Sequence, residues 1–223
     1  MKQIYLGEST KDVTIVTTKI VFMMHTEKLR NELGNIDIYI LDQLLKERYS
    51  QNDKILDAGC GSGRNIHWFY KNRFNVYAVD KEIEQIEYLK LVYPDWSDQF
   101  CSASLEQLPY NDTFFDHIIC SAVLHFATST NHFRTMFSEL IRVLKPTGSL
   151  FIRMTSDIGI ENKVTHLKEG VYRLGDESDR FLLTKDLLSL IMDEHQLSFL
   201  EPLKSTNVHD LRSMSTLVLQ KNG

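Results

Sequence analysis

Long hydrophobic runs and a targeting signal are both missing from this sequence. No stretch of its 223 residues approaches the ~18–20 uncharged apolar residues of a membrane-spanning helix. The N-terminus also lacks the basic segment followed by an apolar one that marks a secretory signal. These absences predict a cytoplasmic protein that does not bind membranes.

Cysteine is also scarce. The chain has three, Cys60, Cys101 and Cys120, an odd number with no Cys-x-x-Cys pair. Each lies in or beside an apolar run of strand character, where free thiols commonly pack. We therefore predict reduced thiols in or near a sheet, and neither a disulfide framework nor a metal site.

Clustered positive charge is the third absence. The formal net charge is −5, and no dense Lys/Arg block is interleaved with aromatic residues. Because a polyphosphate would find no general electrostatic attraction here, nucleic acid is disfavoured as a partner. What the chain does contain is 43% apolar residues, enough at this length for the core of a single domain.

From residue 54 onward, strand-like runs alternate with amphipathic segments of helical length. This alternation is typical of a doubly wound α/β fold, a mostly parallel sheet with helices on both faces. Helices are predicted over about Asn131 to Leu144, capped by Thr130 or Asn131, and over about Lys185–His195, capped by Thr184. Seven strands are predicted, at Lys54–Ala58, Asn75–Asp80, Gln99–Ser102, Phe115–Ser121, Ser149–Met154, Phe199–Lys204 and Thr216–Gln220.

Two regions depart from this alternation. Residues 1–50 precede the first strand and are predicted to form a cap or lid, with a helix near Ile36–Arg48 after a β-prone stretch, Val13–Phe22. Residues 155–183 form a connection longer than the ~12–15 residues at which a special role is suspected. We therefore predict a domain over residues 51–223 in which 155–183 is an insertion that covers a substrate.

The segment Ile55–Asn65 is a strand that runs into a glycine-rich turn and then a helix. Glycines let backbone approach a ligand without a Cβ, and a helix N-terminus offers free N–H groups to an anion. A dinucleotide fingerprint starting at Gly59 would need its third glycine where Arg64 stands, and no Gly-Lys-Ser/Thr follows for a phosphate-binding loop. Both of those ligand classes are disfavoured.

Asp80 ends the second predicted strand, where sheet geometry brings it beside the glycine turn. A carboxylate at that point can accept two hydrogen bonds from a ribose diol. The alternative role is a solvated strand-end cap. With the turn in place, we favour the ribose interaction and hence a nucleoside ligand.

Three segments, in order, resemble class I S-adenosylmethionine-dependent methyltransferases. Asp57-Ala58-Gly59-Cys60-Gly61-Ser62-Gly63 is similar to the first motif of that family. Ser104-Leu105-Glu106-Gln107-Leu108-Pro109 before Phe114-Phe115-Asp116 is similar to its Asp-Ala-x-x-Leu-Pro segment, with Ser104 in place of the aspartate. Arg142-Val143-Leu144-Lys145-Pro146-Thr147-Gly148 is similar to its Arg-Val-Leu-Lys-Pro-Gly-Gly turn, which we interpret as structural.

This resemblance implies an enzyme with a Rossmann-like sheet ordered 3-2-1-4-5-7-6, the last strand antiparallel, and S-adenosyl-L-methionine at the carboxyl ends of its strands. Ser104 would contact the adenine amino group, and the Leu105 N–H a ring nitrogen. Gly63-Arg64-Asn65 also resembles tellurite- and thiopurine-type small-molecule methyltransferases. The implied cofactor-binding residues are Asp57, Gly59, Gly61, Gly63, Asn65, Asp80, Lys81, Ser104, Leu105 and Ser121.

The class of methyl acceptor is inferred by excluding the motifs of other methyltransferases. The fourth predicted strand is not followed by the Asn/Asp-Pro-Pro-aromatic motif of base methylation, no Pro-Cys pair offers a nucleophile for a pyrimidine, and no Asp/Glu pair suggests a catechol-type magnesium site. A small-molecule acceptor remains.

Four residues are candidates for the acceptor side. His125 is a base or orienting donor, or else a structural histidine, while Arg153 binds an anionic substrate or forms an ion pair. His166 and Arg180 lie in the long connection, where the alternative is that both are solvated loop residues. The connection also carries Tyr172, Arg173 and Phe181, a mixture of aromatic bodies and cationic tips suited to a small, partly apolar acceptor that could also be anionic.

Two other functions share these features. A non-catalytic module could bind adenosylmethionine as a sensor or assembly partner. A nicotinamide-dependent oxidoreductase would use the same sheet and Asp80, although Arg64 opposes it.

Overall fold

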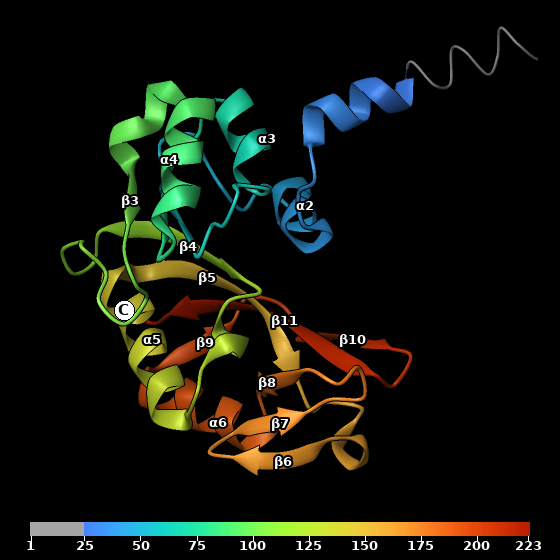
Figure 1. Cartoon of the computed structure of the whole chain (residues 1–223). Helices are drawn as coiled ribbons and strands as arrows, with labels where there is room; N and C mark the ends of the chain where they lie inside the picture. The colour runs from blue at the N-terminus through green and yellow to red at the C-terminus, as the bar shows by residue number, and fades with distance from the viewer. Residues whose placement is uncertain (1–24) are drawn as a thin grey trace, which may run out of the picture.

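The computed structural model describes residues 25–223, which form a central sheet with helices on both faces (Figure 1). The order across this sheet is β3-β2-β1-β4-β5-β11-β10, and β9 also pairs with β11. Its strands are β1 (Lys54–Ala58), β2 (Asn75–Asp80), β3 (Phe100–Ser102), β4 (Phe115–Ser121), β5 (Leu144–Ser156), β9 (Leu197–Phe199), β10 (Lys204–Val208) and β11 (Arg212–Lys221).

Pairing within the sheet agrees with the expected order. β3, β2, β1, β4 and β5 are parallel to their neighbours, and β11 runs antiparallel to β5. One prediction was wrong: the strand expected over Phe199–Lys204 is two strands, β9 and β10, with a break at residues 200–203. The break contains Pro202, which has no N–H to donate to the ladder and so interrupts an edge strand.

Helices cover each face of the sheet and bury a separate apolar core (Figure 1). α2 (Ile38–Leu45), α3 (Ile66–Lys71) and α4 (Ile83–Val92) lie on one face, and α5 (Thr130–Val143) and α6 (Lys185–Glu194) on the other. Side chains along β1 alternate between the two faces. Ile55 packs in the core under α2, α3 and α4, and Leu56 packs in the core under α5 and α6. Both faces of β1 are therefore buried, as in other doubly wound sheets.

Capping residues fix where α5 and α6 begin. Thr184 caps α6 as predicted, accepting a hydrogen bond from the Leu187 N–H. For α5 the predicted cap at Thr130 or Asn131 was wrong, because Ser129 accepts the hydrogen bond from the His132 N–H. Serine, threonine and asparagine are all favoured N-cap residues, so the sequence alone did not show which of the three neighbouring positions begins the helix.

The connection over residues 155–183 folds into a small antiparallel sheet. Its strands are β6 (Thr165–Lys168), β7 (Val171–Arg173) and β8 (Asp179–Phe181), in that order. Phe181 is buried, and its ring stacks on Phe133 of α5 at a centroid distance of 4.9 Å. The Thr155 hydroxyl also donates to the Phe181 carbonyl over 3.0 Å. This insertion is thus packed against the main domain on the α5 side.

The described part of the N-terminal segment contains two helices. Residues 25–33 are helical and largely exposed, and α2 follows within the predicted range near Ile36–Arg48. The β-prone stretch Val13–Phe22 lies outside the described residues. Among the described residues, no helix has the length and apolar character needed to cross a membrane.

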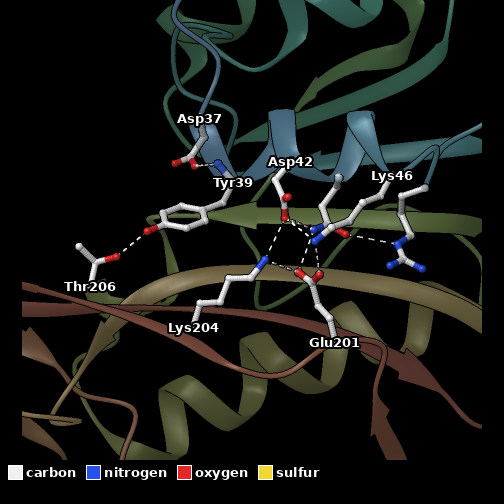
Figure 2. A network of polar contacts seen from close by, with 9 residues as sticks. Asp37, Tyr39, Asp42, Lys46, Glu201, Lys204 and Thr206 are labelled. Atoms are coloured by element: carbon white, nitrogen blue, oxygen red, sulfur yellow. Dashed lines mark hydrogen bonds and ion pairs between the residues drawn. The ribbon is translucent and has the colours of Figure 1, made fainter.

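α2 is held against the edge of the sheet by a network of polar contacts (Figure 2). At the start of the helix, the Tyr39 hydroxyl hydrogen-bonds the Thr206 hydroxyl on β10. The helix is therefore fixed to β10 as well as to the apolar core. The charged members of the network are Asp42, Lys46, Glu201 and Lys204.

Candidate cofactor site

The glycine turn after β1 is shaped by three positive φ angles, 78° at Gly59, 51° at Gly61 and 78° at Gly63. A Cβ on Gly59 would lie 2.4 Å from Val123 Cγ2, and one on Gly63 would lie 2.4 Å from Leu89 Cδ2. These two glycines are required for packing. At Gly61, by contrast, nothing stands within 4 Å of the Cβ position, so its backbone can be approached by a ligand.

Asp80 lies beside this turn, as sheet geometry predicts. Its Oδ2 accepts a hydrogen bond of 2.8 Å from the Gly61 N–H, and its Oδ1 accepts one of 3.0 Å from the Glu82 N–H. Each carboxylate oxygen can accept further bonds. The two contacts fix the orientation of the carboxylate at the rim of the turn.

A cavity of about 450 Å³ opens at the carboxyl ends of β1, β2 and β4. It is large enough for a nucleoside-sized ligand. Six of the predicted cofactor residues line it: Gly59, Gly61, Asp80, Lys81, Ser104 and Leu105. Its remaining lining residues, which the sequence analysis missed, are Glu106, Ala122, Val123, Phe126, His132 and Met136.

Glu106 and His132 form a polar pair at this cavity. His132 Nε2 lies 2.7 Å from Glu106 Oε1, and the Ser104 hydroxyl donates to the other Glu106 oxygen. His132 belongs to the predicted α5 helix, but a helical pattern does not tell which exposed side chain reaches a distant loop. The hydroxyl of Ser104, expected to contact adenine, is thus already bound within the protein.

Asp57 does not line the cavity but lies beneath the turn, where its side chain is 2% exposed. Neither carboxylate oxygen has a hydrogen-bond partner within the described part of the chain. Burial raises the pKa of Asp57 to about 7, the positive charge of Arg64 opposes this shift, and the negative charge of Asp80 adds to it. The ionised form of a buried carboxyl without a hydrogen-bond partner is stabilised by a nearby positive charge, and a neutral neighbour does not give this stabilisation.

Asn65 and Ser121 meet around Asp37, the residue that precedes α2. The Asp37 N–H donates to Asn65 Oδ1 over 3.1 Å, and the Ser121 hydroxyl lies 3.4 Å from Asp37 Oδ2. That oxygen also pairs with Arg64 at 3.0 Å and with Arg153 at 3.3 Å. Asp37 is buried and was missed from the sequence, where it showed only the signal of a helix cap.

Arg153, a candidate for an anionic substrate, is therefore engaged in an ion pair. Its guanidinium also lies over the ring of Tyr39, 5.4 Å from the centroid. Of the two interpretations that the sequence allowed, this geometry favours the ion pair. Arg153 joins β5 to the start of α2.

His125 is placed on the short 3-10 helix η2 (Leu124–Phe126), directly after β4, and is 7% exposed. Its Nδ1 has no partner among the described residues. Burial lowers the pKa of His125 to about 4, and the positive charges of Arg180, Arg153 and Arg212 act in the same direction. The imidazole is therefore neutral at pH 7, which suits it to hydrogen bonding more than to strong proton abstraction.

The other candidates are not brought together. His166 lies on β6 with its ring against Tyr172, and Arg173 pairs with Asp179. Phe181 is in the core, while the Arg180 guanidinium lies over Phe126, which lines the cavity. All three cysteines carry free thiols, with Cys60 and Cys120 buried.

Known proteins match both the sequence and the fold. Residues 56–152, from β1 into β5, match the family model described as a methyltransferase domain. The chain is 33% identical over 125 residues to an uncharacterized methyltransferase, YodH, of Bacillus subtilis strain 168, covering 53% of this chain and 47% of that protein. It is 32% identical over 98 residues to a tRNA (carboxymethyluridine(34)-5-O)-methyltransferase of Arabidopsis thaliana, covering 44% and 23%. The chain thus spans about half or less of the length of these relatives.

The fold is similar to that of an S-adenosylmethionine-dependent methyltransferase from Clostridium acetobutylicum ATCC 824. The TM-score is 0.65 at 14% identity, and the match covers 90% of this chain and 99% of that one. The match therefore covers most of this chain and shows a shared fold.

Proposed function

Because the chain belongs to the class I S-adenosylmethionine-dependent methyltransferases, we propose that it transfers a methyl group from S-adenosyl-L-methionine to a small-molecule acceptor. The observation that carries this proposal is the cavity beside the glycine turn. There the open backbone of Gly61 and the oriented carboxylate of Asp80 face the same space. A nucleoside needs both features, one for close approach and one for its ribose diol.

The residues at this cavity fit S-adenosylmethionine. Asp80 would bind the ribose hydroxyls, while Val123 and Met136 offer apolar surface and the Leu105 N–H a donor for the adenine. Beneath the turn, the unpartnered carboxyl of Asp57 would attract the positive charge of the cofactor. Gly63, Asn65 and Ser121 support this site by packing and by hydrogen bonds to Asp37 and its surroundings.

S-adenosylmethionine supplies a methyl group that is already activated, because its departing group leaves as a neutral thioether. The protein must then mainly align the acceptor nucleophile, and alignment can contribute ~7–11 kcal/mol in favourable cases. Neutral His125 is the group we assign to orienting the acceptor by a hydrogen bond. Arg153 acts with it as a positioning residue, through its ion pair with Asp37.

A small molecule is the acceptor that the charges favour. The net charge is −5, and the cavity is lined by both Glu106 and Lys81, so a nucleic acid would meet repulsion as well as attraction. We also propose that residues 1–50 and the insertion 155–183 cover the acceptor. The packing of β8 against α5 places the insertion next to η2 and the cavity.

The test combines binding with turnover. Calorimetry with S-adenosylmethionine, S-adenosylhomocysteine, NAD and ATP should show binding of the first two only, because the turn lacks the third glycine and the lysine that the others need. Turnover is measured as S-adenosylhomocysteine formed with a panel of small alcohols, amines, thiols and carboxylates. NAD binding without adenosylmethionine binding would refute the assignment. Binding with no turnover on any acceptor would favour a sensor or assembly module.

A further inference from the structure

Arg180, in the middle of β8, lies against Phe126, a residue that lines the cofactor cavity. Its guanidinium lies over the ring of Phe126, 5.1 Å from the centroid. Phe126 lines the cavity and is 60% exposed. A molecule that enters beside Phe126 would therefore meet a planar apolar surface and a guanidinium together.

Arg180 lowers the pKa values of two nearby carboxylates, Asp176 and Asp179, but each of them is paired more closely with another arginine. Arg153 pairs with Asp37 at 3.3 Å, and Arg212 lies 3.6 Å from Asp176. Asp179, the preceding residue of β8, has its carboxylate bound by Arg173.

Arg180 itself forms no ion pair with a described residue. Within residues 25–223, its guanidinium donates one hydrogen bond, to the backbone carbonyl of Asp179 over 2.7 Å. The positive charges of Arg153, Arg180 and Arg212 all lower the pKa of His125, and Arg153 shares the carboxylate of Asp37 with Arg64. Arg180, half-buried beside the cavity, is the one of these arginines that has no described carboxylate within 4 Å.

β8 holds this arginine in place. The next residue, Phe181, is 1% exposed, and its backbone and ring are both fixed to the main domain. A guanidinium on a fixed strand loses less freedom when it binds an anion, and its planar fork matches the oxygens of a carboxylate or a phosphate. An arginine held in this way can bind one carboxylate or phosphate group of a small molecule through paired N–H donors.

We propose that the methyl acceptor carries an anionic group, a carboxylate or a phosphate, which Arg180 binds while Phe126 contacts the neighbouring apolar part of the acceptor. This inference rests on the proposed methyltransferase function. It goes further by naming the chemical class of the acceptor and the residue that selects it.

The experiment measures binding of three small probes by calorimetry: benzoate, phenyl phosphate and neutral benzamide. Each is titrated into the protein alone and into protein saturated with S-adenosylhomocysteine. We expect the anionic probes to bind at least tenfold more tightly than benzamide. The tighter of the two anions identifies the group as carboxylate or phosphate.

Two substitutions of Arg180 test its role. Arg180→Gln should weaken binding of the preferred anion at least tenfold and leave binding of benzamide unchanged. Arg180→Lys keeps the charge but loses the planar guanidinium, so its affinity for the anion should lie between those of Arg180→Gln and the unaltered protein. The matched control is Arg134→Gln, which removes an exposed arginine of α5 paired with Glu194 and should change nothing. Equal anion binding by Arg180→Gln and the unaltered protein, or no preference for anions in the unaltered protein, would overturn the inference. Binding of S-adenosylhomocysteine to each variant is measured separately, so a failure of the cofactor site is recognised by itself.

Discussion

Replacing Asp57 by asparagine should stabilise the cofactor-free protein at alkaline pH. Asp57 is buried with no partner for either oxygen, and burial raises its pKa from 3.8 to about 7. Because the folded-state pKa lies above the unfolded one, the carboxyl binds its proton more tightly in the folded protein. Its ionisation therefore costs stability as the pH rises from about 4 to 7, and the full cost is present above pH 7.

The size of this cost follows from the two pKa values. At ~1.4 kcal/mol per pKa unit, it is roughly 2 kcal/mol at pH 5 and roughly 4 kcal/mol at pH 8.5. The free energy of unfolding of Asp57→Asn, relative to that of the unaltered protein, should therefore rise by roughly 2–3 kcal/mol from pH 5 to pH 8.5. His125 also titrates in this range, but it is present in both proteins, so its contribution cancels in the difference.

Denaturant unfolding followed by circular dichroism, at pH 5 and pH 8.5, measures the difference. Asp42→Asn is the control. Burial pushes the pKa of Asp42 upward, but hydrogen bonds from Lys46 and Lys204 and their positive charges lower it below its ordinary value. Its stabilising effect is complete above the unfolded pKa, so the difference between Asp42→Asn and the unaltered protein should stay constant from pH 5 to 8.5. An Asp57→Asn difference that is equally constant would refute the reasoning.

Two further substitutions test the cofactor site and the insertion. Asp80→Ala should weaken S-adenosylmethionine binding by about 1.5–3 kcal/mol, roughly 10- to 150-fold, because a charged hydrogen-bond acceptor for the ribose is lost. If the variant is shown to be folded by circular dichroism and its dissociation constant is unchanged, Asp80 is not part of the site. Phe181→Ala should lower the free energy of unfolding by about 3–5 kcal/mol, since it empties a fully buried ring position between β8 and α5. Phe126→Ala, at an exposed ring, should cost far less, and equal losses in the two variants would show that the insertion is not anchored through Phe181.

The sequence determined the elements whose signals are local. β1, β2 and β4 have the bounds predicted from their apolar runs, and Thr184 caps α6 as predicted. The glycine turn and Asp80 were also placed together correctly, since the carboxyl ends of neighbouring parallel strands meet at one edge of a sheet. Each of these features depends on residues a few positions apart, or on a fixed relation between adjacent strands.

Only the tertiary structure decided which distant side chains meet. Asp37 gathers Arg64, Ser121 and Arg153 from positions 27 to 116 residues away, and no local pattern marks that destination. The same holds for Arg180, which reaches Phe126 because the insertion folds into strands and packs on α5. The physical reason is that burial and charge pairing depend on the packing of whole elements. That packing places Arg153 in an ion pair and Arg180 over the ring of Phe126 beside the cavity.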